Sequence, residues 1–329
     1  MSKRTCFVVA TIVVAACVRI PATTQVPVSW WAFSDPSDPE PTHAMAARRD
    51  IDVALTGWIV IDSATYRPVR PYVDTAALPS GTARLAFITT YQGGRHRPET
   101  IRGLGTDPGA IGNGASLIVA EAVRNGYTGL VLDFAGMTAR DLDALLSVTG
   151  AITDSAHAHN IRPVVIAVPA ADTSGYPGQL LAGVSDLLLI LSYDHHAEGT
   201  APGSPASPEW FGQKLRARAA EAGSNRIVAA IPVDGYRWIR YGEASRISFV
   251  ETARLLGRTG SRIERDPVSH TLHAQVDNAE IWVSDSELVN ILVRDARRMG
   301  VNRFVLWRLG GEDPQLGTAP DSQTIRRSR

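Results

Sequence analysis

Runs of apolar and β-branched residues alternate with helical patterns along the chain, and this alternation constrains the fold more than any other feature. Most of the runs are uninterrupted stretches of apolar residues and do not alternate with polar ones. This pattern is typical of parallel strands buried on both faces of the sheet. They occupy eight segments: 28–34, 53–62, 84–91, 129–134, 163–169, 186–194, 227–233 and 303–309. Helical patterns are clearest at 110–125, 139–160, 208–223 and 286–300. This order predicts an α/β fold, a (β/α)8 TIM barrel over residues 25–316, with a doubly wound sheet as the alternative.

One interval breaks the alternation, between the seventh run and the last helical pattern. It holds a helix-like stretch at 248–258 and strand-like stretches at 270–275 and 279–283. We therefore expect a small α+β insertion, about residues 240–285, on the C-terminal face of the barrel. The end of the chain, residues 317–329, is polar and tipped with arginine, which predicts a disordered tail.

The charge balance and the polar motifs exclude several functions. Among 329 residues, 33 basic side chains match 33 acidic ones, whereas a nucleic-acid binder needs a basic face. No segment resembles a phosphate-binding loop or a nucleophile elbow, so no cofactor is predicted. Asp194, His195 and His196 are consecutive and project in different directions, and no second ligand motif supports them, so no metal site is predicted either.

The N-terminus has the features of an export signal. Lys3 and Arg4 precede an apolar run at 7–16, which is too short for a stable membrane span. The residues Val-Ala-Ala before Cys17 resemble a bacterial lipobox, in which the cysteine is acylated. We therefore expect a signal peptide at residues 1–24 and an extracytoplasmic lipoprotein, in the periplasm or on the cell surface, that meets the membrane through its lipid anchor only. Plain secretion and an uncleaved anchor are the alternatives.

Four segments resemble strand ends of the family 18 glycoside hydrolases. Residues 125–136 are similar to the fourth strand of that family, and Leu-Ser-Tyr-Asp at 191–194 to its sixth-strand Met-x-Tyr-Asp. Residues 231–238 are similar to the seventh-strand Leu-Pro-x-Tyr-Gly-x-x-Trp. Residues 305–314 resemble the eighth-strand ending of a bacterial subgroup, which includes domains fused to polysaccharide deacetylases and spore or peptidoglycan-associated proteins. The chain thus resembles a chitinase-like TIM barrel over nearly all of its mature length.

The resemblance predicts that the general acid is missing. The family motif Asp-x-x-Asp-x-Asp-x-Glu falls on Thr128, Val131, Asp133 and Ala135, so only Asp133 is retained. In the family the final Glu protonates the leaving oxygen, and the preceding Asp orients the acetamido group of the substrate, which attacks. A methyl group at Ala135 cannot donate a proton. Loss of a positioned general acid typically lowers the rate by about 10²–10⁴.

The expected site residues follow from the same motifs. Asp133 and Asp194 are the candidate catalytic carboxylates. The candidate substrate-binding residues are Tyr193, Trp307, Asp234, Tyr236 and Trp238. An indole can stack on a pyranose face, so Trp307 would form the floor of a sugar site. The alternatives are structural: Asp133 bonded to Ser192 or Tyr193 on neighbouring strands, and Trp307 as a plug of the barrel.

Three functions follow, and the shape of the mouth discriminates between them. The first is an extracytoplasmic barrel that binds a polysaccharide or oligosaccharide of N-acetylated amino sugars without hydrolysing it efficiently. The second is an active glycosidase with a rearranged carboxylate pair, such as Asp133 with Asp194 or Asp194 with Asp234. The third is a scaffold lipoprotein with no sugar site. An open groove lined by aromatic rings favours sugars, and a groove filled by side chains favours the scaffold.

Overall fold

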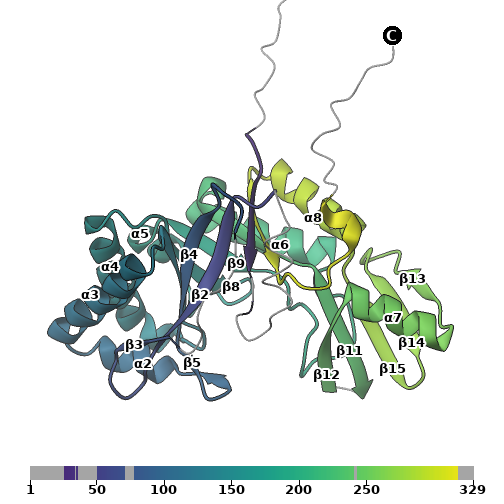
Figure 1. Cartoon of the computed structure of the whole chain (residues 1–329), viewed down its shortest axis with the longest axis horizontal. Coiled ribbons are helices and arrows are strands. Elements are labelled where there is room, and N and C mark those ends of the chain that lie inside the picture. Colours follow the sequence, from purple (N-terminus) through teal and green to yellow (C-terminus); the bar gives the residue numbers. More distant parts are fainter. Residues whose placement is uncertain (1–25, 34, 36–49, 71–77, 241–242, 318–329) are drawn as a thin grey trace, which may run out of the picture.

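Eight parallel strands close into a barrel in the computed structural model, which describes residues 26–33, 35, 50–70, 78–240 and 243–317 (Figure 1). The order around the barrel is β1-β16-β10-β9-β8-β7-β4-β2, and β1 also pairs with β2. That last pairing excludes the doubly wound sheet, in which the first strand would not complete a ring. The predicted (β/α)8 barrel is therefore confirmed.

The barrel strands match the eight apolar runs. Their bounds are β1 Ser29–Phe33, β2 Val53–Ile61, β4 Ala83–Thr89, β7 Gly129–Asp133, β8 Val164–Pro169, β9 Leu187–Leu191, β10 Ile227–Pro232 and β16 Arg303–Trp307. Short strands flank them: β3 Pro68–Val69, β5 Tyr91–Gln92 and β6 Arg95–His96. The helices are α2 Pro98–Leu104, α3 Pro108–Arg124, α4 Leu142–Ala158, α5 Gly178–Val184, α6 Pro208–Ala222 and α8 Ser286–Arg298.

Side chains of each strand alternate between two cores. In β7, Val131 belongs to a core inside the barrel, whereas Leu130 and Leu132 pack in the core between strands and helices. Because side chains have a period of two, Asp133 at the end of β7 faces inward with Val131. The register deduced from the sequence thus aims Asp133 into the mouth of the barrel.

The predicted α+β insertion is present and begins directly after β10. Its five strands form one antiparallel sheet in the order β12-β11-β15-β14-β13, covered by α7. The bounds are β11 Asp234–Arg240, β12 Glu243–Ser248, α7 Phe249–Thr259, β13 Ile263–Arg265, β14 Leu272–Val276 and β15 Ala279–Val283. Figure 1 shows the insertion, in green, projecting on the same side as β5. Strands β11 and β12 were missed in the sequence because polar residues interrupt the apolar ones in both of them.

Several predictions fall outside the described residues. These are the signal peptide at 1–24, its Cys17, and the tail from 318 onward, so they stay predictions. Among the residues that the structure describes, none of the helices has the length and apolar character needed to cross a bilayer.

Candidate functional site

The predicted site residues lie at or just after the C-terminal ends of the barrel strands, all on one face of the barrel. Asp133 ends β7, Tyr193 follows β9, Asp234 follows β10, and Trp307 ends β16. The ring centroids of Tyr193 and Trp307 are 4.7 Å apart, although the two residues are far apart in sequence. The C-terminal face is where TIM-barrel enzymes carry their active sites.

Asp133 is buried and bonded to a strand that the sequence did not point to. The Thr89 hydroxyl, at the end of β4, donates to its Oδ2 over 2.9 Å. Ser192, named from the sequence as a possible partner, instead donates to the carbonyl of Ala230 over 2.7 Å. Burial raises the pKa of Asp133, and the nearby His96 and the Thr89 hydrogen bond oppose that rise.

An arginine from the insertion neutralises the other two carboxylates. Arg246, on β12, lies 2.6 Å from Asp234 Oδ2 and 3.6 Å from Asp194 Oδ1. The Tyr236 hydroxyl donates to Asp194 over 2.7 Å. The Arg246 guanidinium also faces the rings of Tyr236 and Tyr193, 5.3 and 5.9 Å from their centroids. Burial raises the pKa of both Asp194 and Asp234, and the charge of Arg246 opposes that rise.

Aromatic rings continue across the mouth from the insertion side to the β5–β6 hairpin. We call five of them the aromatic row: Tyr193, Trp307, Phe33, Trp58 and Tyr91. The centroid distances along it are 4.7, 4.1, 6.2 and 6.4 Å. Phe33 and Tyr193 both stack nearly parallel to Trp307 and cover its two faces, which leaves Trp307 only 9% exposed. At the other end Tyr91 is 40% exposed, so the row is covered at Trp307 and open at Tyr91.

Two of the predicted binding residues hold the insertion against the barrel. Trp238 is 2% exposed, and its indole nitrogen donates to the carbonyl of Thr200 in the loop after β9. Tyr236 is 6% exposed and contacts Trp238 ring to ring at 5.7 Å. In this conformation neither ring presents a face for sugar stacking.

Five mouth residues were not found from the sequence: Thr89, Tyr91, His96, Trp58 and Arg246. Four of them belong to β2, β4 and the β5–β6 hairpin, for which no family motif was used. The Gly93–Gly94 pair between short polar strands, both glycines with positive φ, is the signal that could have revealed the hairpin. Arg246 lies in a strand that alternates polar and apolar residues, and nothing in that pattern shows which face meets the barrel.

The two adjacent histidines are packing residues. His195 stacks on Trp210 at 4.7 Å, and the His196 ring nitrogen lies 3.0 Å from the Ala201 carbonyl oxygen. Burial lowers the pKa of His195 to about 4. Within the described ranges, no group of three or more His, Cys, Asp and Glu side chains is arranged to hold a metal ion.

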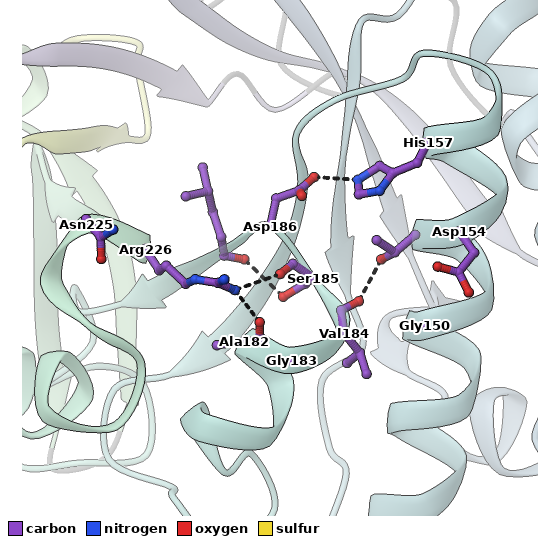
Figure 2. A pocket seen from close by; sticks show the side chains of 12 residues that line it. Gly150, Asp154, His157, Ala182, Gly183, Val184, Ser185, Asp186, Asn225 and Arg226 are labelled. Carbon is purple, nitrogen blue, oxygen red and sulfur yellow. Dashed lines mark hydrogen bonds and ion pairs between the residues drawn. The ribbon is translucent and has the colours of Figure 1, made fainter.

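A hollow of about 660 Å³ lies at the other end of the barrel (Figure 2). Its lining residues precede β9 and β10 or belong to α4. Its polar groups bond to one another: His157 Nε2 lies 2.8 Å from Asp186 Oδ2, and Arg226 donates to the Ala182 carbonyl. The N-terminal face of a TIM barrel serves stability, so this hollow is not the candidate site.

Comparison with known proteins finds glycosylases. The chain is 27% identical over 273 residues to YdhD of Bacillus subtilis (strain 168), whose name describes a sporulation-specific glycosylase. It is 25% identical over 217 residues to YvbX of the same organism, an uncharacterized glycosylase. The matches cover 77% and 61% of this chain but only 64% and 63% of those relatives, less than two thirds of their length. No protein-family profile matches the chain.

Solved structures share the fold at low sequence identity. A chitinase from Chromobacterium violaceum superposes with a TM-score of 0.76 at 18% identity, over 88% of this chain and 97% of that one. A class V chitinase from Pseudomonas fluorescens gives 0.79 at 17% identity, over 88% and 98%. The spore cortex-lytic enzyme SleL from Bacillus cereus gives 0.77 at 16%, over 91% and 74%. In its barrel fold and its sequence, the chain therefore resembles the family 18, chitinase-like glycosidases and their spore-glycosylase relatives.

Proposed function

We propose that the barrel binds a polysaccharide of N-acetylated amino sugars at its C-terminal mouth and hydrolyses it slowly at most. The observation that carries the proposal is the pairing of an aromatic row with a methyl group where the family has its acid. The names of the relatives and neighbours, which describe glycosylases, chitinases and a spore cortex-lytic enzyme, support this class of ligand.

The turn that bears Ala135 is fixed in place. The Tyr176 hydroxyl donates to the Phe134 carbonyl over 2.8 Å and accepts the Met137 amide over 2.9 Å. Ala135 is half-buried in the turn that directly follows β7. No rearrangement of this turn can supply a proton donor at position 135, because the residue itself carries none.

The sugar is expected to lie on the open end of the aromatic row. Trp307 is covered on both faces, whereas Tyr91 is exposed and Trp58 is half-buried beside it. Thr89 connects this end to Asp133, because its oxygen accepts the Tyr91 amide while its hydroxyl donates to the carboxylate. A glycan over Tyr91 and Trp58 would thus reach the one family carboxylate that remains.

Binding is tested with a panel of chitin oligomers, partly deacetylated oligomers and peptidoglycan. We expect the full chain to bind at least one N-acetylated polymer, measured by calorimetry, with little release of reducing sugar. Tyr91→Ala should weaken that binding roughly 5–10-fold, because a stacked ring contributes about 1 kcal/mol. Leu180→Ala, an equally exposed residue on α5, is the matched control. Absence of binding across the panel would leave the scaffold as the function.

A second candidate function, active hydrolysis by a rearranged acid, is favoured by one observation. The side chain of Asp194 is 43% exposed, and burial of its carboxyl raises its pKa, as a proton donor requires. The charge of Arg246 and the hydrogen bond from the Tyr236 hydroxyl, however, stabilise the ionised form of Asp194 and oppose that rise in its pKa. Release of sugar that Asp194→Asn abolishes, with binding retained, would support this candidate.

We also propose that the protein works outside the cytoplasm, anchored by a lipid on Cys17. The basic start, the apolar run at 7–16 and the small residues before Cys17 support this. In a bacterial host, the wild-type chain should partition with membranes, and Cys17→Ser should move it to the soluble extracytoplasmic fraction or leave it unprocessed. Equal membrane association of both forms would contradict the lipid anchor.

A further inference from the structure

His96 lies beside the turn from which the acid is missing. It ends β6, in the hairpin that follows the third barrel strand, and its Nδ1 is 3.8 Å from Asp133 Oδ2. Two residues further on, Pro98 packs against Gly136, where a Cβ would come within 3.4 Å of the proline ring. The segment from His96 to Pro98 therefore runs alongside the segment from Asp133 to Gly136, which places Ala135 next to it.

The imidazole has one buried edge and one exposed edge. Its Nδ1 is buried and, among the described residues, has no hydrogen-bond partner. The side chain as a whole is 34% exposed, so that exposure belongs to the other ring atoms. The Tyr91 ring meets it edge-on at 5.1 Å. A carboxylate on the Nδ1 side is the arrangement that orients an imidazole and leaves Nε2 free for a ligand.

We propose that His96, held by Asp133, is the proton donor that replaces the missing glutamate. The inference rests on the proposed function, since it concerns a glycan bound over Tyr91. The proposal requires that the imidazole moves from the 3.8 Å separation to hydrogen-bond distance when substrate binds, as catalytic hydrogen bonds are often long before substrate binds. The carboxylate of buried Asp133 then balances the positive charge of the protonated ring.

The proposed reaction is a hydrolysis in two steps. In the first, the imidazolium Nε2 gives its proton to the glycosidic oxygen as the C1–O bond breaks with its electron pair on that oxygen. The acetamido carbonyl oxygen of the same sugar forms a bond to C1. In the second, water attacks C1 and returns one proton to Nε2, and the carbonyl oxygen leaves. The sum is the addition of one water across the glycosidic bond, with nothing oxidised or reduced.

Charged side chains lie near the imidazole both on its own segment and on strand β7. On its own segment, Arg95 and Arg97 lie 3.0 and 3.7 Å from Glu99, whose single negative charge balances one of the two positive charges. Across the mouth, Asp133 on β7 is the carboxylate that faces the ring. Asp133 is therefore the carboxylate placed to hold the imidazole of His96.

Leaving-group dependence tests the assignment. Departure of a sugar hydroxyl needs an acid, whereas departure of 4-nitrophenolate does not. His96→Gln should lower cleavage of a chitin oligomer by about 10²-fold and leave cleavage of the 4-nitrophenyl glycoside of the same oligomer almost unchanged. The pH dependence of oligomer cleavage should disappear in the same variant. His159→Gln, an exposed histidine just after α4, is the control and should behave as wild type.

The outcomes separate this inference from the proposed function. Equal losses on both substrates would mean that His96 only supports the structure, and no loss on either would mean that it takes no part. Either result overturns the inference, as does oligomer binding by wild type without any cleavage, although that last result leaves the proposed binding function standing. Failure of the wild type to bind any oligomer would remove both.

Discussion

Replacement of Ala135 by Glu is expected to raise the rate of chitin-oligomer hydrolysis, by about 10²–10⁴-fold where His96 is replaced by Gln and by less where His96 still donates the proton, because it places a general acid where the family carries one. Ala135 is half-buried in a turn that Tyr176 fixes on both sides, so a longer side chain has a defined starting position. Asp133, two residues earlier, would stand beside the new carboxyl as in the family motif. The measurement is release of reducing sugar from the oligomer.

Ala139→Glu is the matched control, since it introduces the same carboxyl four residues away on an exposed position. It should leave hydrolysis unchanged. A further comparison uses His96→Gln in the Ala135→Glu background, where the new acid should make the histidine dispensable. If Ala135→Glu binds the oligomer as wild type does but cleaves no faster, the missing acid does not limit the reaction.

Arg246→Met is expected to lower the free energy of unfolding by about 2–4 kcal/mol, because it leaves the buried carboxylate of Asp234 and the partly exposed carboxylate of Asp194 without their counter-charge. Asp234, at 2.6 Å from the guanidinium, is 7% exposed and would carry most of the penalty. In the variant the folded-state pKa of Asp234 and Asp194 would rise further above that of the unfolded chain. The loss should therefore be largest at neutral pH and shrink as pH falls through the raised folded-state pKa of these carboxyls, where they become neutral. Urea denaturation at several pH values measures it.

Two further variants serve as controls for the loss of stability in Arg246→Met. Arg246→Lys keeps one positive charge and should lose less stability than the methionine variant. Arg254→Met removes an exposed arginine on α7 and should change stability very little. A loss that is the same for Arg246→Met and Arg254→Met, or that does not depend on pH, would contradict the role given to the ion pair.

The barrel could be predicted because its signal is local. Each strand reads as an apolar run of five to nine residues, and burial on both faces fixes that pattern wherever a parallel strand occurs. The side on which Asp133 points follows from the period of two in β7. Strands β11 and β12 of the insertion carry no such pattern, since one face of an antiparallel sheet can meet water.

The mouth could be predicted only where family motifs mark it. Tyr193 and Trp307 stack on one another and Asp133 ends a strand at the same face of the barrel, but their partners come from distant segments whose approach depends on the folded geometry. Thr89 reaches Asp133 from the neighbouring strand, and Arg246 reaches Asp234 across a sheet of the insertion. The stacking that covers Trp307 likewise depends on Phe33 and Tyr193 lying on either side of it, which residue spacing does not encode.

The insertion enters and leaves the barrel at almost the same place. Gly235 pairs with Val283 across β11 and β15, and the Ser284 amide donates to the Asp234 carbonyl over 3.1 Å. A segment whose ends meet in this way can be exchanged for another without straining the ring of strands that carries it. A barrel given a foreign module in place of residues 235–283 would keep its shape, but it would retain the carboxylates of Asp234 and Asp194 without the guanidinium of Arg246. The positive charge that balances the carboxylates of the mouth therefore belongs to the insertion and not to the barrel.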